Sequence, residues 1–163
     1  MASIHSRRLQ FPGMSRPNDP AFVREMMARL DEGGISTWLF GGWAEELLGL
    51  IRPRAHHDVD LLHAAPDFTN ADALIARNGD LAEIRRKRFA HKRAFLSEGV
   101  MIELLLVQPA DGKLVTLFWG TTRHVWPVDV LDQRVGGIRV ASAAAVLGYR
   151  AAHDRLRDAT SCR

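Results

Sequence analysis

The fold of this 163-residue chain is decided by residues 35–62, which read ISTWLFGGWAEELLGLIRPRAHHDVDLL. The first six residues form an apolar, β-prone run that stops at two glycines. Residues 43–50 are compatible with a helix, which the RPR triplet at 52–54 breaks. A second apolar run at 59–62 predicts another strand. The segment therefore predicts a strand, a double-glycine turn, a helix and a second strand in succession.

The rest of the chain adds helices and strands in a mixed order. Asp19-Pro20 supplies an N-cap and a proline at the first helical position, and Gly33-Gly34 ends that helix. The other expected elements are a helix over 66–78, strands over 81–88, 91–97, 100–108 and 114–119, and a last helix from Ser142 through Leu156. Residues 120–141 are expected to be irregular. This order predicts an α+β fold with a mixed, largely antiparallel sheet flanked by helices.

Composition places the chain among ordinary folded domains. With 25% charged and 47% hydrophobic residues it is not globally disordered, and its length fits one domain. The net charge of +3 is too slight to indicate a nucleic-acid partner, and the single Cys162 excludes an internal disulfide. We expect a flexible N-terminal arm over residues 1–18 and a single domain over 19–163. No apolar run approaches the roughly 20 residues of a membrane span, so we expect a cytoplasmic protein with no membrane partner.

Three carboxylates are the first candidates for chemistry. On a strand, Asp58 and Asp60 project from the same face about 7 Å apart, and a divalent cation would relieve their repulsion. Magnesium prefers such oxygen ligands, although a solvated surface pair is the alternative. Glu103 lies in the apolar run 100–107, where an unpaired carboxylate is costly. If the two strands are neighbours, the carboxylates converge as in two-metal phosphoryl transfer. The alternative is that Glu103 pairs with a nearby arginine.

The glycine pair and the loop before the Asp strand supply the second group of candidates. The backbone at Gly41 and Gly42 allows close approach, and its amides at the start of a helix favour a phosphate. A plain turn is the alternative. Arg54 either contacts the nucleotide or pairs with Asp58, and His56 either orients the loop or acts as a base.

Together, GGW at 41–43 and RAHHDVD at 54–60 resemble a known family. The motif is similar to that of small nucleotidyltransferases related to the lincosamide and aminoglycoside nucleotidyltransferases, within the DNA polymerase β-like superfamily. The resemblance implies the nucleotidyltransferase fold. It also implies a magnesium-dependent enzyme that moves a nucleoside monophosphate from ATP or another nucleoside triphosphate to a hydroxyl of a small molecule, releasing pyrophosphate.

The same resemblance assigns roles to residues. It implies two magnesium ions, with Asp58, Asp60 and Glu103 as the catalytic and metal-binding set and Glu103 as general base or ligand. The residues expected to bind the nucleotide are Gly41, Gly42, Trp43, Arg54 and His56. Two positions depart from the family pattern, because many relatives carry Ser at the position of Trp43 and a Lys-Asp pair where this chain has His153-Asp154.

Residues 85–93, RRKRFAHKR, form a basic run that is either a solvated face or a contact for a polyanion. We expect it to lie beside the active site, which favours a neutral or anionic acceptor and makes aminoglycosides poor substrates. Phe118 and Trp119 are candidates for the wall of an acceptor pocket. Two other functions remain open: a catalytically silent relative that binds nucleotide or a partner, and an RNA-directed, toxin-like nucleotidyltransferase.

Overall fold

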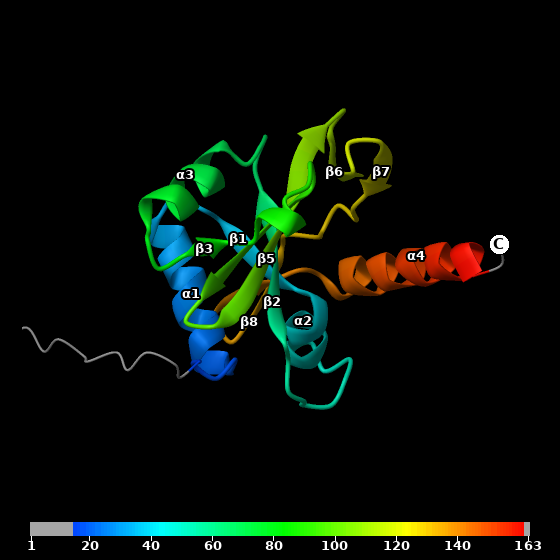
Figure 1. The fold of residues 1–163 in the computed structure, drawn as a ribbon. Helices are drawn as coiled ribbons and strands as arrows, with labels where there is room; N and C mark the ends of the chain where they lie inside the picture. The colour runs from blue at the N-terminus through cyan, green and yellow to red at the C-terminus, as the bar shows by residue number, and fades with distance from the viewer. Residues whose placement is uncertain (1–14, 162–163) are drawn as a thin grey trace, which may run out of the picture.

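The computed structural model describes residues 15–161, which form one mixed sheet with helices packed against it (Figure 1). The strands are β1 (Thr37–Phe40), β2 (Asp58–Ala64), β3 (Ala82–Glu83), β4 (Lys92–Ser97), β5 (Val100–Ala110), β6 (Lys113–Phe118), β7 (Thr122–Val125), β8 (Gln133–Val135) and β9 (Ile138–Val140). The helices are α1 (Pro20–Glu32), α2 (Gly41–Leu47), α3 (Thr69–Arg77) and α4 (Ala143–Ser161), with a 3₁₀ turn, η1 (Arg85–Lys87).

The sheet order is β3-β4-β5-β2-β1-β9-β8, and β6 continues from β5 with β7 beside it. The pairs β2–β5 and β1–β9 are parallel, whereas the other strand pairs in the described part of the chain are antiparallel. The predicted α+β fold with a mixed, largely antiparallel sheet is therefore confirmed. The parallel pairing of β2 with β5 is the contact that matters most for function, because it joins the two strands that carry the candidate carboxylates.

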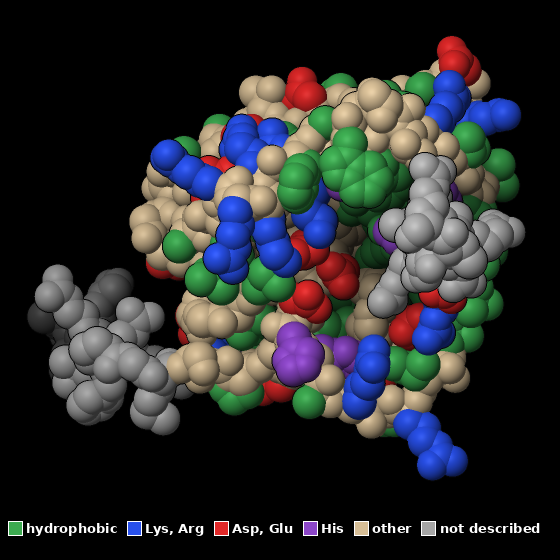
Figure 2. All heavy atoms as spheres, turned by 45° about the vertical axis from the view of Figure 1, so that its right-hand side comes forward, with side chains coloured by type: hydrophobic (Ala, Val, Ile, Leu, Met, Phe, Trp, Pro, Cys, Tyr) green, Lys and Arg blue, Asp and Glu red, His purple; other side chains and the backbone are tan. Residues whose placement is uncertain are grey.

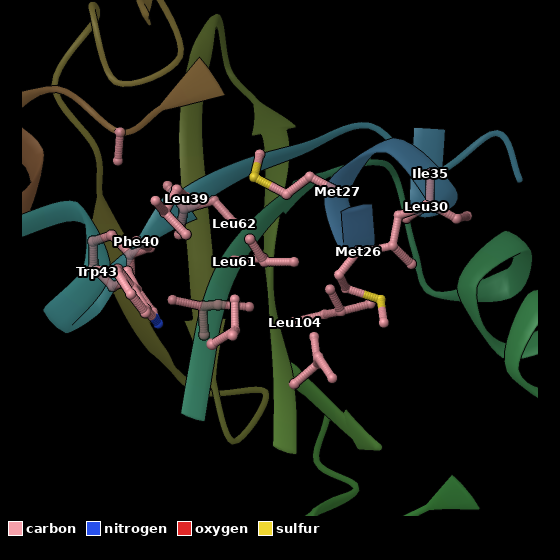
Figure 3. Close-up of a cluster of buried hydrophobic side chains, with 14 of the residues drawn as sticks. Met26, Met27, Leu30, Ile35, Leu39, Phe40, Trp43, Leu61, Leu62 and Leu104 are labelled. Atoms are coloured by element: carbon pink, nitrogen blue, oxygen red, sulfur yellow. The ribbon is translucent and has the colours of Figure 1, made fainter. Parts of the chain in front are cut away.

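Helix α1 holds the centre of the sheet in place. Its N-cap is the Asp19 side chain, which accepts a hydrogen bond of 2.8 Å from the backbone N–H of Phe22. Met26 and Met27 lie among the sheet residues around Leu61 (Figure 3). The buried stripe of the helix consists of Phe22, Val23, Met26, Met27 and Leu30. This packing makes β2 part of a rigid platform, because close-packed side chains resist displacement.

Two sequence-based expectations about strands were wrong. The strand expected over 81–88 is reduced to the two residues of β3, after which the chain turns through η1. The turn carries Lys87 and Arg88 toward carboxylates on other elements. Residues 120–141, expected to be irregular, contain β7, β8 and β9. These strands have only three or four residues each, too few for an alternating pattern to show in the sequence.

Of the predicted N-terminal arm, residues 1–14 lie outside the described residues. The following residues contact the domain. The backbone N–H of Arg16 donates to the carbonyl of Glu98 at 2.9 Å. The side-chain amide of Asn18 donates to the carbonyls of His56 and Asp58 at 2.9 and 3.1 Å. The domain boundary at residue 18 stays a prediction.

An ion-pair cluster on α3 gives a testable stability effect. The carboxylate of Asp72 accepts hydrogen bonds from Arg93 and Arg88, at 2.7 and 2.6 Å. Burial opposes ionisation of Asp72, but the two guanidiniums prevail and lower its pKa. A lowered pKa gives stability that is present above the unfolded-state pKa and lost as the pH falls through the folded-state pKa. Asp72→Asn should therefore lower the free energy of unfolding at pH 7 by about 1–2 kcal/mol, and by far less at pH 3.

Urea unfolding at the two pH values measures this effect. The matched control is Asp111→Asn, because Asp111 is 83% exposed and its contact with Arg123 is 3.4 Å long. An equal loss of stability for both variants at pH 7 would show that the Asp72 cluster is not stabilising.

Within residues 15–161, none of the helices has the length and apolar character needed to cross a bilayer. A cytoplasmic location stays a prediction.

Candidate active site

The register of β2 on β5 brings the three candidate carboxylates to one place. Asp58 and Asp60 alternate with buried Val59, so both project from the same face of β2. In the parallel pair, Asp60 lies directly across from Glu103. Figure 2 shows acidic side chains gathered in a hollow on this face, between basic and histidine side chains. The sequence predicts that the carboxylates converge if the two strands are neighbours, and β2 and β5 are neighbours.

Asp60 is held in an unfavourable electrostatic environment. Burial raises its pKa to about 7, and the charges of Asp58 and Glu103 add to the effect. In the described part of the chain, neither Asp58 nor Asp60 uses its carboxylate in a hydrogen bond or an ion pair. The predicted pairing of Arg54 with Asp58 is likewise not formed. Two oxygen-donor side chains with no protein partner, on one strand face, fit a divalent cation that prefers carboxylate oxygens.

The glycine pair shapes the wall beside Asp60. Gly41 has φ +59°, a left-handed conformation, and a Cβ at this position would overlap the Asp60 carboxylate. A Cβ at Gly42 would lie 2.8 Å from Nδ1 of His56 and 3.3 Å from the guanidinium of Arg54. Because glycine has no Cβ, the backbone at the start of α2 can lie directly against the carboxylate of Asp60.

Gly41→Ala should lower turnover by about 10²-fold or more, because the added methyl group would displace the Asp60 carboxylate. Steady-state kinetics with the variant measures this. Gly49→Ala is the matched control, since Gly49 has φ +72° but nothing within 4 Å of an added Cβ. Both variants carry the strain of a left-handed residue, about 1–2 kcal/mol, so equal activity in both would refute a role for close approach at Gly41.

The loop before β2 is fixed by hydrogen bonds rather than by contacts with the cleft. Nε2 of His56 lies 2.7 Å from the Glu46 carboxylate, which also accepts from the backbone N–H of Arg54 at 3.1 Å. The hydrogen bond from His56 lowers the pKa of Glu46. The indole N–H of Trp43 donates to Asn18, and its ring lies 4.3 Å from that of His56. These contacts favour the interpretation that His56 orients the loop.

The structure therefore brings only some of the predicted nucleotide-binding residues to the carboxylates. Gly41 and Gly42 lie in the wall of the cleft, and Arg54 lies against Gly42. Trp43 is 8% exposed and belongs to the hydrophobic core, behind the site. Its predicted contact with the nucleotide is not supported by this placement.

Glu103 is engaged by two cations. Its carboxylate oxygens accept hydrogen bonds from Lys87 and Lys92, each at 2.5 Å, so the alternative of an ion pair is realised with two lysines and not with an arginine. Burial by itself raises the pKa of Glu103, but the lysines outweigh it and the pKa is lowered. In residues 15–161 no three His, Cys, Asp or Glu side chains form a set of metal ligands. The donor set thus fits a cation at Asp58 and Asp60 better than one that also binds Glu103.

Part of the basic run over 85–93 lies beside the candidate carboxylates, as expected, and part of it lies against α3. Lys87 and Lys92 pair with Glu103, whereas Arg88 and Arg93 pair with Asp72 on α3. The carboxylates offset only part of this charge, because Lys87 and Lys92 share the single charge of Glu103. The preference for a neutral or anionic acceptor stays a prediction.

A cleft of about 290 Å³ opens in front of the carboxylates, and we call it the acidic cleft. It is walled by the start of α2, by β2 and β5, and by one face of α4. Its acidic and basic residues are Glu45, Asp60, Lys92, Glu103, Arg150, His153 and Asp154. Both members of the His-Asp pair noted in the sequence therefore reach the cleft.

A sequence model of the aminoglycoside-2″-adenylyltransferase family matches residues 22–135, well over half of the chain. The chain belongs to this family. The matched range includes Gly41, Gly42 and all three carboxylates, and it ends before α4. Among curated proteins, none matches the chain by sequence.

Solved structures carry the same fold. A lincosamide antibiotic adenylyltransferase bound to lincomycin has a TM-score of 0.64 at 15% identity, covering 82% of this chain and 87% of its own. ANT(2″)-Ia in complex with adenylyl-2″-tobramycin has a TM-score of 0.58 at 18% identity, covering 83% and 76%. A Thermotoga maritima protein described as a nucleotidyltransferase has a TM-score of 0.61 at 19% identity, covering 93% and 94%. The predicted fold and enzyme class, a nucleotidyltransferase, are confirmed.

Sequence reasoning missed three residues of the cleft in this member of the adenylyltransferase family. Glu45 on α2 lines the cleft and pairs with Arg150 at 3.0 Å. The signal was available, because Glu45 follows Gly41 by four residues and so shares its helix face. Tyr149 is the third, and burial, with the charges of Asp60 and Glu103 adding, raises its pKa to about 12. Its place in the cleft depends on how α4 packs, which the sequence did not reveal.

Proposed function

We propose that this adenylyltransferase-family protein is a magnesium-dependent enzyme that transfers a nucleoside monophosphate, from ATP in the first instance, to a hydroxyl group of a small molecule. The observation that carries the proposal is the pair of carboxylates on one face of β2, Asp58 and Asp60, which have no hydrogen-bond or ion-pair partner among the described residues. Asp60 lines the acidic cleft. Two of the solved structures named above hold lincomycin and adenylyl-2″-tobramycin, which supports a small-molecule acceptor.

Asp58 and Asp60 would hold the magnesium through their carboxylate oxygens. When bound, the metal lowers the pKa of the attacking hydroxyl and neutralises charge on the triphosphate. The raised pKa of Asp60 supports this assignment, because a cation would remove the repulsion that opposes its ionisation.

The remaining residues bind and orient the substrates. The backbone at Gly41 and Gly42 lets the nucleotide approach Asp60, and Lys92 and Arg150 are the cations that a triphosphate meets in the acidic cleft. The acceptor oxygen attacks the α-phosphorus in line, a bond forms between them, and the bond from that phosphorus to pyrophosphate breaks. Glu103 is our candidate for the group that takes the hydroxyl proton. To do so it must release one of its two lysines, which otherwise hold it ionised and weakly basic.

The experiment is incubation with labelled ATP, CTP, GTP and UTP, magnesium and a panel of hydroxyl compounds that includes kanamycin and lincomycin. Pyrophosphate release and labelled product are measured. We expect release that depends on both magnesium and acceptor, with ATP preferred. Release that persists without a divalent cation would contradict the metal assignment.

A second candidate function, a nucleotide-binding protein without catalysis, is favoured by the two lysines that occupy Glu103. The same incubation separates the two, because a silent protein binds labelled nucleotide and releases no pyrophosphate with any acceptor. No comparison points to RNA as the acceptor. An RNA-directed enzyme would show RNA binding that falls steeply with salt.

A further inference from the structure

A second cavity lies beside the acidic cleft. It has a volume of about 310 Å³ and opens between the β6–β7 hairpin and α4, which lie on the same side of the molecule (Figure 1). We call it the aromatic cavity, because five of its lining residues carry rings: Phe118, Trp119, His124, Tyr149 and His153. Tyr149 and His153 line both this cavity and the acidic cleft.

We propose that the aromatic cavity is the subsite for the acceptor and that it selects an uncharged compound with an apolar ring next to the reactive hydroxyl. The inference rests on the proposed function. It adds the class of acceptor and the residues that recognise it.

The walls are suited to holding a flat ring. Tyr149 is the centre of the ring contacts, with centroids 4.3 Å from His153 and 6.0 Å from Phe118. It also stacks on Trp126 at 5.7 Å and 10°, which fixes its orientation. When a ring binds between aromatic walls that are already in place, apolar surface is buried without the entropy cost of ordering those side chains.

His124 supplies a polar atom that lacks a partner. Its Nε2 is buried and makes no hydrogen bond in the described structure. Burial lowers the pKa of His124, so the imidazole is neutral at pH 7. Because this atom is covered by other protein atoms, a ligand in the cavity does not reach it, and His124 contributes to the wall as an uncharged ring.

Trp119 lines the aromatic cavity from the turn between β6 and β7. It is 60% exposed and has φ +53°. Its backbone N–H donates to Nδ1 of His91 at 2.9 Å, which holds the residue in this conformation. The conformation is that of a tight hairpin turn, as at Glu98 and Asp111, and it leaves the ring of Trp119 exposed at the cavity.

The charge around the aromatic cavity argues against a cationic ligand there. Among the described residues that line it, none is acidic, and Arg123 is a cation at its edge. The carboxylates lie on the other side of Tyr149, in the acidic cleft. A ring seated in the aromatic cavity would therefore leave an attached hydroxyl directed past Tyr149 toward Asp60.

Calorimetric binding of phenyl β-D-glucopyranoside and methyl β-D-glucopyranoside, without nucleotide or metal, tests the inference. The two compounds share the sugar and differ only in the group on its anomeric oxygen, which is phenyl in one and methyl in the other. We expect the phenyl compound to bind at least about 10-fold more tightly, the effect of burying one phenyl group. Trp119→Ala should weaken phenyl binding by about 5-fold or more, whereas the control Leu117→Ala, 38% exposed in β6 and outside the cavity lining, should not.

The outcomes separate this inference from the proposed function. Equal binding of the two glucosides, or equal loss in both variants, overturns the aromatic subsite even if pyrophosphate release is seen. Ring-dependent binding that Trp119→Ala weakens and Leu117→Ala does not supports the subsite even if no transfer occurs. Transfer to kanamycin with no preference for the phenyl compound would leave the enzyme assignment intact and refute the acceptor class.

Discussion

Replacing Asp60 by Asn is expected to lower nucleotidyl transfer by about 10³-fold or more while making the metal-free protein more stable. The loss follows from removing a metal ligand, since a bound ion stabilises the transition state by several kcal/mol. Asp58→Asn should lose activity in the same way. Steady-state pyrophosphate release measures the effect. The control Asp111→Asn changes a carboxylate outside the cleft and should be fully active. A fully active Asp60→Asn enzyme would remove the residue from the mechanism.

The gain in stability should depend on pH with a definite sign. The folded-state pKa of Asp60 is about 7, above its ordinary value of 3.8. The contribution of protonated Asp60 to the free energy of unfolding is therefore fully present below pH 4 and is lost as the pH rises through 7. The variant carries no such charge. Its advantage should be absent near pH 3.5, grow between pH 4 and 7, and level off above, at no more than about 4 kcal/mol.

Urea unfolding in a metal chelator at pH 3.5, 6 and 8 measures the difference between wild type and Asp60→Asn. Added magnesium should then stabilise the wild type and not the variant, because an ion that binds only the folded state raises its stability. A magnesium effect of equal size in both proteins would place the ion elsewhere.

Glu103→Gln is expected to lower kcat by about 10²-fold or more, the effect of losing a general base. The KM for ATP should stay within about twofold, and the melting temperature should barely fall. The reason is that Lys87 and Lys92 have side chains 32% and 26% exposed, so both remain hydrated without the carboxylate charge.

The opposite pattern would assign Glu103 a different role. If it positions the two lysines for the triphosphate, the KM for ATP rises while kcat is nearly unchanged. Lys92→Met should then reproduce the effect on KM. Strong destabilisation with normal turnover would leave Glu103 as a structural ion-pair partner only.

The local parts of the site could be predicted from the sequence because their causes are local. Alternation along a strand places Asp58 and Asp60 on one face whatever the strand pairs with. The capping residue Asp19 and the apolar stripe of α1 likewise operate over one helix. The glycines at 41 and 42 mark a turn where no side chain fits, and Gly41 does meet Asp60. For these features a window of a few residues holds the physical information.

Tertiary structure alone decided the rest, because the partners are far apart along the chain. Asp60 faces Glu103 only through the parallel pairing of β2 with β5, which joins segments separated by the whole of α3 and β4. From the sequence the basic run was either a solvated face or a polyanion contact, whereas four of its cations pair with Glu103 or Asp72, since each side chain follows the direction of its own turn or strand. The aromatic cavity arises where α4 packs beside the β6–β7 hairpin. Side chains drawn from two distant segments form that wall, so no pattern within either segment could predict it.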